Sequence, residues 1–82
     1  MVHVISTMGE VAIFTGGAAE FDVPAETVGE LFAALEHRYP GLGDFAAQRM
    51  AVAIDGVIYQ DALAEPLNGV REVCLIPKIG GG

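Results

Sequence analysis

The fold is decided by the stretch Thr27-Val-Gly-Glu-Leu-Phe-Ala-Ala-Leu-Glu-His-Arg-Tyr-Pro-Gly-Leu42. Thr27 and Glu30 form a capping box, in which the Thr side chain accepts a hydrogen bond from a free amide and Glu30 reaches back. Pro40-Gly41 ends the helix. The apolar residues recur at the spacing of one helix face, at Val28, Leu31, Phe32, Leu35 and Tyr39. This stretch therefore predicts a helix with one buried face.

Strand patterns lie on both sides of this helix. In the first, Val2, Val4 and Ser6 share one face. Asp55-Gly56 indicates a hairpin turn because both residues tolerate positive φ. The predicted strands are residues 2–7, 20–23, 51–54, 57–59 and 72–77.

Three segments are less regular. Residues 10–14 either extend the first strand or form a loop, and residues 61–66 form a loop or one helical turn. Asp44 is expected to cap a short turn through Phe45 and Met50.

Two strands, a helix and then more strands predict an α+β fold, with the one main helix packed across one face of a mixed sheet. A β-grasp (ubiquitin-like) roll, in which the first and last strands are central and parallel, fits this order by analogy.

Composition excludes several classes of function. The chain has 82 residues, which predicts one domain, and a formal charge of −7, which makes it a poor ligand for nucleic acid and for anionic membranes. A single cysteine excludes a disulfide framework, a four-thiolate zinc site and a plant-type iron–sulfur cluster. No segment has the length of a membrane span and the first residues do not resemble a signal peptide, so a cytoplasmic location is expected.

Conventional catalytic groups are sparse. Cys74 lies inside a predicted strand and is read as a small hydrophobe, and His3 and His37 have no second ligand nearby in sequence.

The unusual feature of the sequence is its last segment, Lys78-Ile79-Gly80-Gly81-Gly82, because three glycines have no packing use. Residues 79–82 are expected to form a flexible tail beyond a domain of residues 1–78. The tail can reach about 13–14 Å and carry the Gly82 carboxylate into another protein.

The chain resembles the MoaD/ThiS family of ubiquitin-like sulfur carriers. The likeness rests on the helix stretch quoted above, on Val52-Ala-Ile-Asp-Gly56, and on Glu72-Val-Cys-Leu-Ile-Pro-Lys-Ile-Gly-Gly-Gly82. The second resembles the family's V-x-V-N-G, and the third its closing E-V-x-I-x-P-x-x-(small)-G-G. Thr15-Gly16-Gly17 looks more like the cysteine-synthesis carriers of the CysO type, so the pathway stays open.

The resemblance implies chemistry at one atom. A MoeB- or ThiF-like enzyme would bind the domain, and the Gly82 carboxylate would attack the α-phosphate of MgATP to give an acyl-adenylate. A persulfide from a cysteine desulfurase or rhodanese would then replace AMP, leaving a thiocarboxylate. The sulfur would pass to an acceptor such as the large subunit of molybdopterin synthase. The chain itself would bind no cofactor and would not be an enzyme, because ATP, magnesium and sulfur belong to the partners.

The remaining site residues concern docking. Alternation places Cys74 and Ile76 on the sheet face away from the helix, and an exposed apolar face of this kind marks an interaction site. Ile79 would be buried only in a complex, and Gly80 and Gly81 are expected to bind the partner with it. Lys78 is either a solvated charge, which is the favoured reading, or a rim contact to an acidic residue of the partner. Alternative functions are a carrier for cysteine, thiamine or tRNA thiolation, a protein modifier joined through Gly82, and a β-grasp binding domain with an inert tail.

Overall fold

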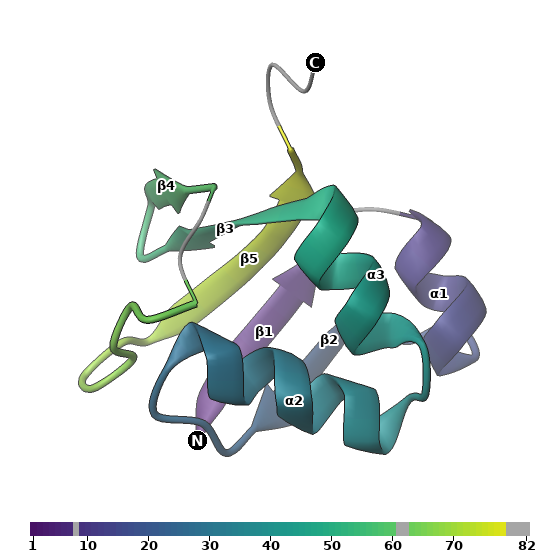
Figure 1. Cartoon of the computed structure of the whole chain (residues 1–82), viewed down its shortest axis with the longest axis horizontal. Helices are drawn as coiled ribbons and strands as arrows, with labels where there is room; N and C mark the ends of the chain where they lie inside the picture. Colours follow the sequence, from purple (N-terminus) through teal and green to yellow (C-terminus); the bar gives the residue numbers. More distant parts are fainter. Residues whose placement is uncertain (8, 61–62, 79–82) are drawn as a thin grey trace.

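The described residues form one five-stranded sheet and three helices. The computed structural model describes residues 1–7, 9–60 and 63–78. Figure 1 shows α2 and α3 lying across one face of the sheet, with α1 beside them at one end. In chain order the elements are β1 (Val2–Ser6), α1 (Gly9–Thr15), β2 (Glu20–Val23), α2 (Val28–Arg38), α3 (Leu42–Arg49), β3 (Met50–Ile54), β4 (Val57–Tyr59) and β5 (Glu72–Pro77).

The sheet has the order β2-β1-β5-β3-β4. The first and last strands, β1 and β5, are adjacent and parallel, and every other pair is antiparallel. This confirms the predicted mixed sheet with its central parallel pair. Because β5 is paired on both sides, the strand that leads to the C-terminus is held along its whole length.

Helix α2 begins as its capping pattern predicts, with one difference. The side chain of Thr27 accepts a hydrogen bond from the Glu30 backbone N–H at 3.1 Å. The Glu30 carboxylate accepts from the N–H of Glu26 at 3.2 Å instead of from that of Thr27. The predicted apolar face is correct, since Leu31 and Leu35 are fully buried against the sheet.

The prediction for residues 10–14, an extension of the first strand or a loop, is wrong. These residues belong to helix α1. Val11 is buried and Phe14 packs against the core, three residues further along the same face. The ring of Phe14 lies 5.4 Å from that of Phe45 in α3, measured between centroids. The helix ends where Gly16 takes a φ of +72°, a conformation that glycine adopts without strain.

A full helix, α3, replaces the predicted short turn, and Asp44 does not cap it. The N-cap position is Gly41, which has no side chain to offer. The Glu36 carboxylate of α2 accepts hydrogen bonds from the N–H groups of Gly41, at 2.7 Å, and Asp44, at 3.1 Å. The cap therefore comes from the preceding helix, which the turn at residues 40 and 41 brings alongside.

The hairpin between β3 and β4 is confirmed. Asp55 and Gly56 both have positive φ, at 46° and 89°. The Asp55 carboxylate also accepts from the backbone N–H of Arg71 at 3.2 Å and of Glu72 at 3.1 Å. This side chain ties the hairpin to the start of β5.

Candidate functional site

One face of the sheet carries no helix, and an apolar row crosses it. The pairing register aligns Ile5 of β1, Cys74 of β5, Ala53 of β3 and Ile58 of β4. The first three are partly buried, and Ile58 is 50% exposed. We call these four residues the open-face row. It is an apolar surface of the kind that a protein partner covers.

The final strand alternates between core and open face as predicted. Val73 and Leu75 are fully buried beneath the helices. Cys74 and Ile76 are partly buried on the opposite face, where Ile76 lies beside Ala51. The structure thus brings these two predicted docking residues onto one surface.

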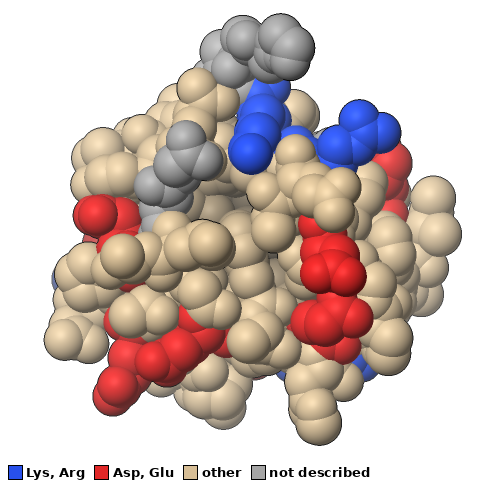
Figure 2. Space-filling view, in the orientation of Figure 1, with Lys and Arg blue, Asp and Glu red and all other residues tan. Residues whose placement is uncertain are grey.

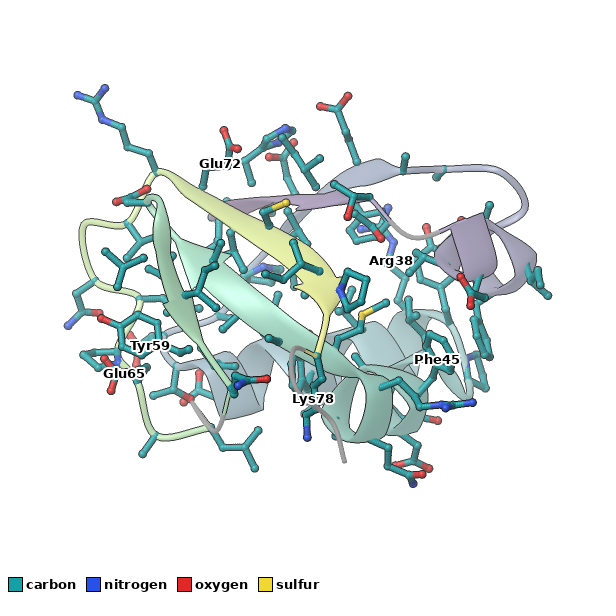
Figure 3. The ribbon with its side chains drawn as sticks, turned by 90° about the horizontal axis from the view of Figure 1, so that it is seen from above. Arg38, Phe45, Tyr59, Glu65, Glu72 and Lys78 are labelled. Carbon is teal, nitrogen blue, oxygen red and sulfur yellow. The ribbon has the colours of Figure 1, made fainter. Side chains whose placement is uncertain are left out.

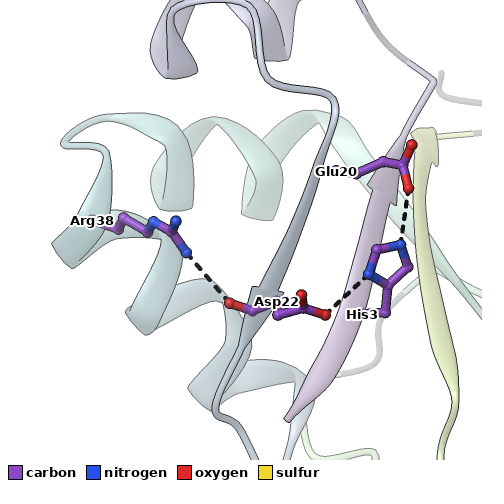
Figure 4. Close-up of polar contacts among 4 residues, drawn as sticks. All are labelled: His3, Glu20, Asp22 and Arg38. Atoms are coloured by element: carbon purple, nitrogen blue, oxygen red, sulfur yellow. Dashed lines mark hydrogen bonds and ion pairs between the residues drawn. The ribbon is translucent and has the colours of Figure 1, made fainter.

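An acidic cluster borders the open-face row at the β2 edge. His3 lies between two carboxylates, with Nδ1 3.0 Å from Asp22 Oδ1 and Nε2 3.0 Å from Glu20 Oε1 (Figure 4). The hydrogen bond with Asp22, followed by that with Glu20, raises the pKa of His3. Arg38 donates to the Asp22 backbone oxygen at 3.3 Å. These contacts place His3 in a surface ion-pair cluster with Asp22 and Glu20.

Cys74 is not poised for nucleophilic chemistry. Burial, reinforced by the nearby charge of Glu72, raises the pKa of its thiol. A thiol with a raised pKa remains protonated at neutral pH, whereas the thiolate is the nucleophile. Within the part of the chain that the structure describes, no group of three His, Cys, Asp or Glu side chains is arranged to hold a metal ion.

The exit of the chain from the sheet is anchored. Pro77 of β5 pairs with Met50 of β3, and the Lys78 N–H donates to the Arg49 backbone oxygen at 3.2 Å. Figure 3 shows Glu72 and Lys78 at opposite ends of β5. The predicted site residues Ile79, Gly80, Gly81 and Gly82 lie outside the described residues. The structure therefore shows how the chain is held up to Lys78. The flexibility expected of residues 79–82 stays a prediction.

Arg49 is a neighbour of the exit that the sequence did not reveal. It is the last residue of α3 and is exposed, as is Lys78. No local pattern connects residues 49 and 78. The only signal is the antiparallel register of β3 with β5, which needs the topology to be known first.

In the described residues, no helix is long and apolar enough to cross a membrane. None of the curated protein sequences matches the chain. Among solved structures, the chain is similar to one in the crystal structure of the Amycolatopsis orientalis BexX/CysO complex, with a TM-score of 0.80 and 20% identity over 100% of both chains. It is also similar to Mycobacterium tuberculosis CysO, described as an antigen, with a TM-score of 0.81 and 18% identity over 96% of this chain and 100% of that one.

At these identities the two neighbours show a shared fold. The sequence evidence is broader, because the family model of ThiS matches residues 5–82, which is nearly the whole chain and includes the terminal glycines. The chain therefore belongs to the ThiS family: it is a small ubiquitin-like sulfur carrier with the β-grasp fold, which serves other enzymes as a co-substrate and is not itself an enzyme.

Proposed function

We propose that the α-carboxylate of Gly82 is the sulfur-carrying group. The observation that carries the proposal is the anchored exit of the chain from β5. Four residues without bulky polar groups follow this exit, and the ThiS family model matches the chain through residue 82. Fully extended, these four residues span about 13–14 Å. That reach separates the reacting carboxylate from the domain and allows an enzyme to enclose it.

The proposed reaction needs no catalytic side chain from this chain. A carboxylate oxygen of Gly82 attacks the α-phosphorus of ATP, and pyrophosphate leaves. A persulfide sulfur then attacks the acyl carbon, and AMP leaves with the electron pair of the broken C–O bond. A second thiol cleaves the resulting acyl disulfide, which releases the thiocarboxylate and forms a disulfide on the donor. The raised pKa of Cys74 agrees with this division of labour, because it lowers the fraction of thiolate that could compete for sulfur.

Docking on the adenylating enzyme is assigned to the open-face row together with Ile76. These residues form an uncovered apolar surface, and Ile76 lies two residues before Lys78 on the strand that leads to the tail. An enzyme that covers this face therefore has the start of the tail beside its contact surface. The enzyme is expected to be of the MoeB/ThiF type, and ATP and magnesium would enter with it.

The acceptor of the sulfur is the finer part of the proposal. The resemblance to the MoaD/ThiS family, together with a chain longer than that of the thiamine carriers, favours a precursor of molybdopterin held by the large subunit of molybdopterin synthase. A second candidate is a cysteine-forming synthase, favoured by the similarity in fold to CysO and by the turn Thr15-Gly16-Gly17. Loss of the carried sulfur in the presence of one acceptor system and not the other decides between them.

The test of the carrier chemistry is the intact mass of the untagged protein after incubation with ATP, an adenylating enzyme and a sulfur donor. We expect a gain of about 16 Da, the replacement of one oxygen by sulfur. The same mass shows whether Gly82 is the last residue of the mature protein. Deletion of Gly82 should abolish the gain. Failure to gain mass with every adenylating enzyme of the source organism would refute the proposal, and an isopeptide-linked ladder would favour a protein modifier.

Docking has a matched pair of variants. Ile58→Lys places a charge in the open-face row, whereas Ile13→Lys makes the same change on α1, where Ile13 is 80% exposed. We expect Ile58→Lys to slow the mass gain at least tenfold and Ile13→Lys to leave it unchanged. Equal effects of the two variants would remove the open face from the proposal.

A further inference from the structure

Positive charge gathers at the C-terminal exit of a chain that is acidic as a whole. The sequence contains four Lys and Arg residues against eleven Asp and Glu residues. Two of the four, Arg49 and Lys78, are joined by the backbone hydrogen bond at the exit. In Figure 2, basic side chains gather at this end of the molecule, while acidic side chains form separate patches lower on the face shown. Without this pair the formal charge would be −7 − 2 = −9.

Both side chains are available to a partner. Each residue is exposed, and within residues 1–7, 9–60 and 63–78 no carboxylate oxygen lies within the 4.0 Å of an ion pair with either. Arg38 differs, because it donates to Asp22 and lies 5.4 Å from the centroid of the Tyr39 ring. The pair therefore has no structural task within the described part of the chain that would account for its charge.

The phosphates of ATP are not the natural target of this pair. When the tail is extended, Lys78 is separated from the Gly82 carboxylate, and hence from the reacting phosphate, by about 13–14 Å. This exceeds the screening length of about 8 Å at physiological ionic strength. The two cations would instead lie at the mouth of the channel that encloses the tail. A charge at that position acts on the protein surface surrounding the mouth.

We propose that Arg49 and Lys78 form a basic collar that docks on carboxylates at the rim of the tail channel in the adenylating enzyme. An acidic rim would repel the rest of this molecule, so only the orientation with the tail foremost would be attractive. Such charge complementarity acts mainly on the rate of association and on orientation. The inference rests on the proposed function, because it takes the enclosed tail as its starting point.

The chain offers a matched control for the test. Arg49→Glu, Lys78→Glu and Arg71→Glu each change the formal charge by −2, but Arg71 lies before the start of β5, at the opposite end of that strand from Lys78. Binding of each variant to the adenylating enzyme is measured without ATP, so that the result does not depend on sulfur transfer. The 16 Da gain is followed separately. Arg49→Lys keeps the positive charge, so this variant should bind the adenylating enzyme as the wild type does if charge determines the association rate.

We expect association to slow about tenfold or more for the Arg49 and Lys78 reversals at low ionic strength, and to change far less for Arg71→Glu. The difference should shrink at about 1 M salt, where the screening length is about 3 Å. Equal slowing in all three variants would overturn the collar and leave only an effect of net charge. If the wild type binds the adenylating enzyme and the three variants differ as expected, but no protein gains about 16 Da, only the proposed function is refuted. If the wild-type chain binds no adenylating enzyme of the source organism, both fail.

Discussion

The crossing of α2 and α3 provides a demanding test of the fold. A Cβ atom added at Gly43 would lie 2.6 Å from the backbone oxygen of Phe32 and 2.6 Å from Glu36 Cβ. Both distances are 0.4 Å shorter than the 3.0 Å limit that real Cβ atoms respect. The Phe32 oxygen belongs to the α2 backbone, so the clash is relieved only if the two helices move apart. We therefore predict that Gly43→Ala destabilises the protein.

Two opposing effects set the magnitude. Replacing Gly by Ala inside a helix stabilises it by up to about 1 kcal/mol, and by less in the first turn, where Gly43 lies. Overpacking costs about 1–3 kcal/mol, and a clash with backbone belongs in the upper part of that range. The expected net loss is about 1–2 kcal/mol of unfolding free energy. A domain of this length has only about 4–12 kcal/mol in total, so the change is large enough to measure.

Urea unfolding followed by circular dichroism measures this loss, with Gly9→Ala as the control. Gly9 is also helical, but apart from its chain neighbours and its own helix no atom of the described residues lies within 4 Å of the Cβ it would gain. This variant should therefore be as stable as the wild type or slightly more stable. The urea dependence should keep its slope in both variants, which would show that the denatured state is unchanged. A Gly43→Ala protein with a midpoint equal to or above that of the wild type would refute the close approach of the two helices.

Three further predictions test other features of the fold. Thr27→Ala should lower the unfolding free energy by about 1 kcal/mol in urea titrations, because the amide three residues on loses its cap, while Thr27→Ser should retain most of it. Gly56→Ala should cost about 1–2 kcal/mol by the same titration. Its φ is +89°, and apart from its chain neighbours no atom of the described residues lies within 4 Å of the added Cβ, so that only backbone strain is added. The hydrogen bonds with Asp22 and Glu20 raise the pKa of His3 above 6.5, its value in the unfolded chain. Their contribution to stability is therefore complete below pH 6.5 and is lost as the pH rises through the pKa that His3 has in the folded protein. His3→Gln should therefore destabilise the protein more at pH about 5.5 than at about 8.5, and the opposite trend would contradict the ion-pair cluster.

Local signals account for the parts of the fold that the sequence predicted well. The capping box places the start of α2 at one residue, and the φ values that Asp55 and Gly56 tolerate fix the hairpin register. Alternation in β5 assigns Val73 and Leu75 to the core. Each of these features depends on neighbours within a few residues, so a single sequence is enough to reveal it.

The missed features depend on contacts between distant residues. Helix α1 is too short to be stable alone, and it is held by Val11 in the core and by Phe14 against Phe45. Helix α3 takes its cap from Glu36, eight residues before Asp44, which no local pattern at residues 41–44 announces. The position of Arg49 beside Lys78 likewise follows only from the pairing of β3 with β5. Sequence reasoning therefore named Lys78 but not Arg49, its partner in the charged pair at the exit from β5.

The structure also suggests how a sulfur carrier can keep a cysteine on the face that we propose for docking. Cys74 lies in the middle of the open-face row, between Ile5 and Ala53, in a reaction sequence that would expose it to persulfide and thiocarboxylate sulfur. Thiol exchange at this position would divert sulfur from the tail, and its rate depends on the fraction of thiolate. Partial burial in an apolar row and the negative charge of Glu72 both raise the pKa of the thiol, so the thiolate is scarce at neutral pH. Covering the face with an apolar partner would remove more water and raise that pKa further. Docking would therefore suppress the side reaction at the moment when sulfur is transferred, which leaves the terminal carboxylate as the acceptor that the proposed chemistry requires.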